Sequence, residues 1–210
     1  KYTKDYYKKI NFGLVINFNY KLLDDLSKEK IEDLVFKLTK LGMKVKKITM
    51  PEFDNLNSLI SNHGSLVNYE AWNFWKNKIN KKLNKVDSNV VDRFLIGKNM
   101  KKNTVNLIKK KISELEKKVL YKLNKFHFIL TPTVAFPPPN LRELKRKNYY
   151  HNLNNLALDN TRAANVFDLC AISLPLYLDK KKWLSISILS KKNNDENLLA
   201  VAEKIESILR

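Results

Sequence analysis

The side chains that most often carry out catalysis or bind metals are few and widely spaced in this sequence. Histidine occurs only at His63, His127 and His151, and Cys170 is the single cysteine. None of these four has the spacing of a metal-ligand set with another. Cys170 lies in an apolar run, which favours a buried and unreactive thiol, and His127 lies in a predicted strand, which favours a structural role. We therefore expect no metal site.

Loops that bind phosphate and turns that activate a serine are also missing. The four glycines, Gly13, Gly42, Gly64 and Gly97, are isolated from one another, so they form no glycine-rich phosphate loop. No serine lies in the strand–turn–helix motif of a nucleophile elbow. The residues by themselves therefore predict neither a cofactor site nor a self-contained active site.

Threonine and asparagine occupy positions at which polar side chains could face a ligand. Thr131 and Thr133 flank Pro132 at the carboxyl end of a predicted strand, where α/β proteins usually bind ligands. Thr161 and Asn165 are four residues apart, so we expect them to share one face at the start of a helix. Residues of these types also cap helices and close turns, so a purely structural role stays open.

The segments around these residues predict an α/β fold. Residues 10–18 form an apolar run typical of a buried strand, and residues 31–41 have helical spacing after Ser27, a candidate N-cap. Residues 45–50 predict a second strand that Pro51 closes. A strand, a helix and a strand within about forty residues are typical of a βαβ unit.

The remaining elements follow from the same patterns. Residues 56–83 predict an aromatic helical region in which Trp72 and Trp75 pack into the core rather than stack on bases. A long amphipathic helix is expected around residues 105–123. The other expected elements are strands over 126–131, 170–174 and 183–189, the second of these ending at Pro175, and a final helix that begins near residue 195.

The net charge of +19 indicates less about function than its size suggests. Only five of the 40 cationic residues are arginine, the 35 lysines are dispersed along the chain, and asparagine occurs 26 times while glycine occurs four times. Arginine is the residue suited to bidentate phosphate and base contacts. We therefore favour solvated lysine-rich helix faces over nucleic-acid binding.

Composition also excludes several protein classes. One cysteine cannot support a disulfide framework, and no apolar run approaches the roughly 18–20 residues of a membrane helix. The chain begins with Lys1 and no charged-then-apolar leader follows. We expect a cytoplasmic protein and a chain that is a piece of a longer polypeptide.

Five blocks of the sequence, in this order and at this spacing, resemble the C-terminal half of amidase signature enzymes over nearly all 210 residues. The blocks are INFGLVINF with the following helix and strand, VDSNVVDRFLIGKNM, FHFILTPTVAFPPP, NTRAANVFDLCAISLP and ISILSKKNNDENLLAVAEKIE. The resemblance implies an α/β fold, a mixed twisted β-sheet flanked by helices, with residues 1–210 as the C-terminal part of a single amidase signature domain.

The resemblance also implies an activity that this chain cannot complete. Amidase signature enzymes hydrolyse carboxylic amides with a Ser, cis-Ser, Lys triad, in which one serine attacks the carbonyl and the other two groups carry its proton to the leaving nitrogen. The triad and its Gly/Ser-rich signature lie upstream of the part that this chain resembles, and the chain has no Gly-Gly or Ser-Ser pair. We expect no catalytic residue here, no metal or other cofactor, and no hydrolysis by this segment alone.

By resemblance, Thr131, Thr133, Thr161 and Asn165 are the best candidates for residues of the substrate pocket, and Arg162 braces the loop beside it. The implied partners are a small amide substrate and the N-terminal half of the same enzyme, with a homodimer as a further possibility.

Three other functions stay open. Glutamine-dependent tRNA amidotransferase A subunits carry an Arg on the long helix and an Asp shortly before the Thr matched by Thr161. This chain has lysine at residues 109–111, and its Asp159 lies one residue nearer to Thr161 than we expect for such a subunit. Both differences favour a general amidase. The second function is that of a non-catalytic basic nucleic-acid-binding segment, and the third is that of a degenerate half-enzyme that acts as a scaffold.

Overall fold

The computed structural model describes residues 3–79, 85–177 and 183–209. The elements in chain order are α1 (Lys4–Lys8), β1 (Asn11–Val15), η1 (Phe18–Leu22), α2 (Asp25–Lys40), β2 (Lys44–Ile48), α3 (Pro51–His63), α4 (Leu66–Ile79), α5 (Ser88–Asn99), α6 (Lys102–Leu123), β3 (Phe128–Pro132), η3 (Glu143–Lys145), α7 (Lys147–Val166), β4 (Cys170–Tyr177), β5 (Trp183–Ser190) and α8 (Asp195–Leu209).

The five strands form one mixed sheet in the order β2-β1-β3-β5-β4. β1 pairs in parallel with both β2 and β3, while β5 runs antiparallel to its neighbours β3 and β4. The carboxyl ends of β1, β2, β3 and β4 therefore lie at one edge of the sheet, which we call the carboxyl edge. The expected βαβ unit and the mixed sheet flanked by helices are both confirmed.

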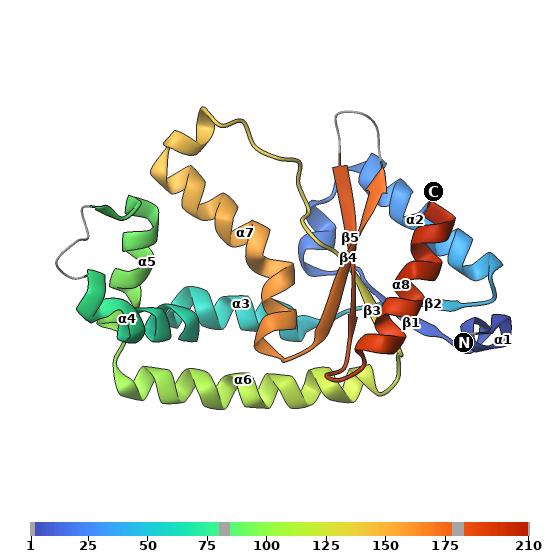
Figure 1. Cartoon of the computed structure of the whole chain (residues 1–210), viewed down its shortest axis with the longest axis horizontal. Coiled ribbons are helices and arrows are strands. Elements are labelled where there is room, and N and C mark those ends of the chain that lie inside the picture. The colour runs from blue at the N-terminus through green and yellow to red at the C-terminus, as the bar shows by residue number, and fades with distance from the viewer. Residues whose placement is uncertain (1–2, 80–84, 178–182, 210) are drawn as a thin grey trace.

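Helices cover the two faces of the sheet (Figure 1). α2 and α8 pack on one face, where they enclose Leu130 of β3 and Ile186 of β5. α3, α6 and α7 pack on the other face, against Ile129 of β3 and Leu189 of β5. Alternate residues of a strand point to opposite faces, so a central strand with helices on both sides is buried throughout. All five residues of β3 are indeed buried.

Three local predictions from the sequence need correction. α2 begins three residues before the predicted position, because the Asp24 carboxylate accepts the hydrogen bond of the Ser27 backbone N–H and Asp24 is the N-cap. Pro51 opens α3 instead of closing β2, since proline at the first helical position needs no N–H donor. β4 continues through Pro175, which an edge strand tolerates because one side of its backbone is not in the ladder.

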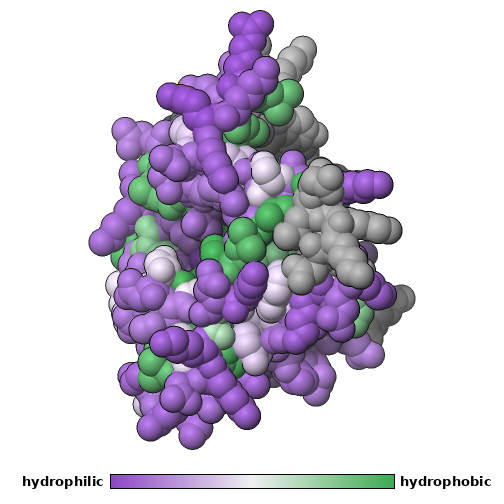
Figure 2. Space-filling view, turned by 90° about the vertical axis from the view of Figure 1, so that its left-hand side faces the viewer, coloured by the Kyte–Doolittle hydropathy of each residue, from purple (hydrophilic) through white to green (hydrophobic). Residues whose placement is uncertain are grey.

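The predicted helical region over 56–83 is divided at Gly64, whose φ of 82° lies in the left-handed region. Core packing is confirmed for Trp72, which is 9% exposed, but it is wrong for Trp75, which is 41% exposed. Phe74 is exposed as well. This end of the molecule, which contains α4 and α5, is mostly hydrophilic, with hydrophobic residues in the middle of the face and in smaller patches around it (Figure 2).

Candidate functional site

Three hydroxyl side chains meet at the carboxyl edge of the sheet, and we call them the hydroxyl cluster. The Thr133 Oγ1 atom lies 2.8 Å from Ser173 Oγ of β4 and 2.8 Å from Ser187 Oγ of β5. The backbone N–H of Thr133 also donates to the Ser185 carbonyl at 2.8 Å. Thr133, which directly follows β3, is therefore hydrogen-bonded to both β5 and β4.

The sheet register explains why these hydroxyls lie together. Thr131 pairs with Ser187, and Ser187 pairs with Ser173, so their side chains leave the same face of the sheet. Thr133 follows Thr131 by two residues and points the same way. This is the face that carries α3, α6 and α7, because Ile129 on the same side of β3 packs there.

The hydroxyl cluster is buried at one end and open at the other. Ser187 is 7% exposed, and the neighbouring Thr131, which is outside the cluster, is 2% exposed. In contrast, Ser173 is exposed, as are Ala171 and Pro175 on the same face of β4. The described helices therefore leave this face of β4 uncovered. Three hydroxyls supply three O–H donors, and two of these donors are used within the cluster. Within the described residues, one O–H and several lone pairs of these side chains are not used by the contacts inside the cluster and could bind an outside partner.

The turn after β3 is also held by α7, which packs on the same face of the sheet as the hydroxyl cluster. The Nδ2 atom of Asn160 donates to the carbonyl oxygen of Pro132, the residue between Thr131 and Thr133. Asn160 is 2% exposed. This contact joins the middle of α7 to the end of β3, so the position of the hydroxyl cluster depends on α7 as well as on the sheet.

A second polar group lies on α7 and α3. The Arg162 Nη1 atom donates to Asp159 Oδ1 and to Asn57 Oδ1, at 2.9 Å each. Burial raises the pKa of the Asp159 carboxyl, and the Arg162 guanidinium opposes that rise. These contacts tie α7 to α3. Arg162 lies within α7 rather than in a loop, so its expected role in bracing a loop beside the pocket stays a prediction.

Thr161 and Asn165 lie where the sequence did not place them. Both are in the second half of α7, because the helix begins at Lys147, and the expectation of a helix start at Thr161 is wrong. The Thr161 hydroxyl donates to the Leu158 carbonyl of the preceding turn. Asn165 is exposed, and within the described residues its side chain makes no hydrogen bond. Neither residue touches the hydroxyl cluster through a hydrogen bond, so their role in a pocket stays a prediction.

Asn160, Ser173 and Ser187 are the site residues that sequence reasoning missed. The alternation of residues 183–189 does put Ser187 on the face opposite Ile186 and Ile188. However, the order of strands in the sheet is a tertiary property, so the sequence could not place Ser173 and Ser187 beside Thr133.

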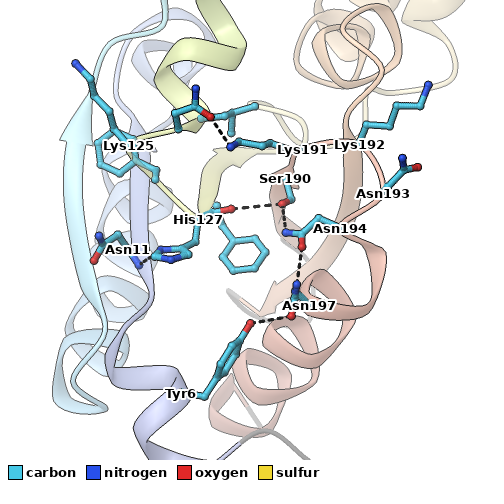
Figure 3. Close-up of a pocket in the computed structure, with 14 residues that line it drawn as sticks. Tyr6, Asn11, Lys125, His127, Ser190, Lys191, Lys192, Asn193, Asn194 and Asn197 are labelled. Carbon is cyan, nitrogen blue, oxygen red and sulfur yellow. Dashed lines mark hydrogen bonds between the residues drawn. The ribbon is translucent and has the colours of Figure 1, made fainter.

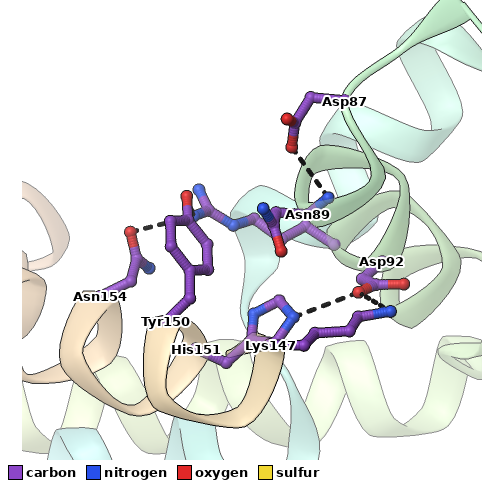
Figure 4. A network of polar contacts seen from close by, with 8 residues as sticks. Asp87, Asn89, Asp92, Lys147, Tyr150, His151 and Asn154 are labelled. Carbon is purple, nitrogen blue, oxygen red and sulfur yellow. Dashed lines mark hydrogen bonds and ion pairs between the residues drawn. The ribbon is translucent and has the colours of Figure 1, made fainter. Parts of the chain in front are cut away.

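The segment VDSNVVDRFLIGKNM forms α5, which docks on α7 through a polar network (Figure 4). The Arg93 guanidinium donates to Asn154 Oδ1 at 3.0 Å. Asp92 Oδ2 accepts from Lys147 Nζ at 2.7 Å and lies 3.1 Å from His151 Nε2. The hydrogen bond from Lys147 is the largest cause that lowers the pKa of the Asp92 carboxyl, and the hydrogen bond from His151 lowers it further.

A cavity of about 520 Å³ lies at the opposite edge of the sheet, between the starts of β1 and β3 and the start of α8 (Figure 3). One wall is a chain of side chains in which Asn194 donates to Ser190 Oγ and Asn197 donates to Asn194 Oδ1. On the other side, His127, which directly precedes β3, accepts the Asn11 backbone N–H at its Nδ1 atom. The structural role expected for His127 stays a prediction. The cavity contains none of the four predicted pocket residues.

The described residues add two further findings. No group of three or more His, Cys, Asp or Glu side chains among them is arranged to hold a metal ion. Every helix in the described ranges is too short or too polar to cross a membrane.

Comparison with known proteins identifies relatives along almost the whole chain. The family description "Amidase" matches residues 2–199. The 2-amino-5-chloromuconic acid deaminase of Comamonas testosteroni is 29% identical over 82 residues, which are 39% of this chain and 18% of that protein.

Solved structures share the fold at low sequence identity. Allophanate hydrolase of Kluyveromyces lactis is 16% identical with a TM-score of 0.82, over 96% of this chain and 32% of that one. The A subunit of glutamyl-tRNA(Gln) amidotransferase from Thermotoga maritima is 17% identical with a TM-score of 0.61, over 92% of this chain and 41% of that one. The chain spans less than half the length of each of these relatives. Because the family match extends over residues 2–199, the chain belongs to the amidase family.

Proposed function

We propose that the full-length protein hydrolyses a small carboxylic amide, and that residues 1–210 contribute part of its substrate pocket. The observation that carries this proposal is the hydroxyl cluster of Thr133, Ser173 and Ser187, which opens on an uncovered sheet face in a chain of the amidase family. An amide offers one carbonyl acceptor and one or two N–H donors. Hydroxyl groups can satisfy both kinds of partner because each of them donates and accepts.

The hydroxyl cluster is suited to binding rather than to bond cleavage. A hydroxyl becomes a nucleophile when an adjacent base removes its proton, and the partners of Thr133 are two further hydroxyls. The resemblance assigns nucleophile, bridging serine and lysine to the upstream half of the domain. In our proposal that half supplies the Ser, cis-Ser, Lys triad, and this chain supplies the sheet, the core and one wall of the pocket.

Thr161 and Asn165 enter the proposal as residues at the margin of the pocket. They lie on one flank of α7, next to the face on which Asn160 contacts β3. The exposed amide of Asn165 is available to a partner that covers this side of the helix.

The proposal is tested by assaying ammonia release from simple amides such as benzamide with the full-length protein and with its Thr133→Val variant. Loss of one hydrogen bond of about 0.5–1.5 kcal/mol raises KM by up to about tenfold. Thr39→Val is the matched control, because the Thr39 hydroxyl donates to the Val35 carbonyl within the outer helix α2, away from the hydroxyl cluster.

Two results would contradict the proposal. The first is an unchanged KM in the Thr133→Val variant while the full-length protein turns over amides. The second is clear turnover by residues 1–210 alone that is lost on substitution within this segment, because the catalytic groups would then lie here.

An amidotransferase A subunit is the second candidate, favoured by the fold shared with the Thermotoga maritima protein. It predicts ammonia release from glutamine by the full-length protein together with partner subunits, and no release from simple amides. Lysine at residues 109–111 and the spacing of Asp159 before Thr161 support the general amidase instead.

Nucleic-acid binding, a homodimer, a scaffold role and a cytoplasmic location remain predictions from the sequence. Nucleic-acid binding through the lysines would be tight and would weaken steeply as salt rises.

A further inference from the structure

Asn160 is a buried polar side chain whose contact lies between two of the predicted pocket residues. We propose that Asn160 is a positioning residue that fixes the turn after β3 and, through it, the hydroxyl of Thr133. This inference rests on the proposed function for its consequence in catalysis, although its structural part can be tested separately.

The hydrogen bonds around Pro132 show how the turn is held. Proline has no backbone N–H, so its carbonyl oxygen is its only backbone group that can form a hydrogen bond. That oxygen accepts from Asn160 Nδ2. β3 ends at Pro132, and one residue later the Thr133 N–H donates to the Ser185 carbonyl. Two contacts, one to α7 and one to β5, therefore determine where the turn lies.

The orientation of the Asn160 amide is also determined. A rotated amide would bring Oδ1 against the Pro132 oxygen, and two acceptors repel each other, so Nδ2 must face Pro132. Oδ1 is then left buried without a hydrogen-bond partner among the described residues. An unsatisfied buried acceptor is unfavourable, and an apolar side chain of similar size would avoid that cost. The hydrogen bond to the Pro132 carbonyl is therefore the interaction that asparagine provides at this position and an apolar side chain could not.

The consequence for the hydroxyl cluster follows from its geometry. Thr133 lies at the centre of the cluster and contacts Ser173 and Ser187 at 2.8 Å each. A small movement of the turn would break one or both of these contacts, because hydrogen bonds weaken quickly beyond about 3.2 Å. Asn160 thus acts on a bound substrate through Thr133 rather than by touching it.

The experiment compares the Asn160→Leu variant of the full-length protein with a matched control, Asn19→Leu. Asn19 is also buried, at 4% exposure, and its Nδ2 also donates to a backbone carbonyl, that of Leu156 on α7. Both substitutions therefore remove a buried side-chain amide that lies on or against α7, but only the Asn160 amide contacts the turn after β3. Asn160→Asp, which keeps the shape and replaces the donor, is the second variant if Asn160→Leu does not fold.

The first readout is hydrogen exchange of residues 131–139, which does not require activity. We expect faster exchange of this segment in the Asn160 variant, by about tenfold or more, and no change in Asn19→Leu. Equal exchange in the two variants would overturn the positioning role. If the wild-type protein hydrolyses no amide, the proposed function fails while this readout still decides the inference.

The second readout is KM and kcat for an amide substrate, measured with Asn160→Leu, Thr133→Val and the double variant. If Asn160 acts through Thr133, KM rises in each single variant and the double variant is no worse than the more affected single one. Effects of the two substitutions that multiply in the double variant would overturn the inference. A loss of activity in Asn160→Leu that matches Asn19→Leu at equal thermal stability would also overturn it.

Discussion

Gly97 offers the sharpest stability prediction, because α5 crosses the backbone of α4 at this residue. Gly97 is buried within α5. A Cβ atom at this position would lie 1.9 Å from the Asn68 carbonyl oxygen, 2.4 Å from the Asn68 carbonyl carbon and 3.0 Å from the Tyr69 nitrogen. These are backbone atoms of α4, so no side-chain rotation can relieve the contact. Gly97→Ala therefore requires the two helices to move apart.

The magnitude follows from two opposing effects. Alanine favours a helix over glycine by about 0.5–1 kcal/mol, which would stabilise the variant. Overpacking of a well-packed contact costs about 1–3 kcal/mol, and sometimes more. The 1.9 Å contact must lengthen to an ordinary distance of at least 3.4 Å, so overpacking is the larger effect. We expect a net loss of about 1–2 kcal/mol in the free energy of unfolding.

Urea denaturation measures the loss, and hydrogen exchange over residues 66–79 and 88–99 shows where it occurs. The control is Asn99→Ala, an exposed substitution in the same helix, which should change stability by less than about 0.5 kcal/mol. A Gly97→Ala protein as stable as the wild type, with unchanged exchange in α4 and α5, would refute the close crossing.

Three other perturbations have defined outcomes. The Glu52 carboxylate is 7% exposed and lies 2.7 Å from Lys122 Nζ. Lys122→Met leaves this carboxylate buried without its cation and should lower the free energy of unfolding, measured by urea denaturation, by about 1–3 kcal/mol. Adding Glu52→Gln should recover part of this loss. Asp92→Asn removes a carboxylate whose pKa is lowered by Lys147. The ion pair therefore stabilises the folded wild-type protein fully above about pH 4, the ordinary pKa of an aspartate, and this stabilisation is lost as pH falls through the lowered pKa. Acid-unfolding curves of variant and wild type that stay apart at the lowest pH would contradict this. Ser190→Ala leaves the Asn194 amide without its acceptor at the cavity of Figure 3 and should cost about 1 kcal/mol by thermal unfolding, with Ser58→Ala as the exposed control.

The helices and strands follow the hydrophobic pattern closely wherever one face of an element is buried. The stripe over residues 105–123 becomes α6, with Val105, Ile108 and Val119 buried, and residues 183–189 lie within β5. Both predictions succeeded because apolar residues at period 3.6 or period 2 can be buried by only one kind of backbone.

The boundaries of elements were predicted less well, because local patterns compete with tertiary contacts. α7 extends fourteen residues before Thr161, a stretch whose polar sequence gives little helical periodicity. Its first half is held instead by α5, through Arg93 and Asp92. Trp75 has the same residue type as Trp72 and lies three positions later, yet only Trp72 is covered by neighbouring elements.

The sequence by itself determined the α/β class, the βαβ start and the order of blocks that resembles an amidase, since these depend on residue types and their spacing along the chain. The tertiary structure decided that β5 inserts between β3 and β4 and thereby brings Ser173 and Ser187 to Thr133. It also decided that Asn160 of α7 reaches the carbonyl of Pro132. These residues are separated by 28 to 54 positions, and their contacts depend on strand order and helix docking, which no local pattern specifies.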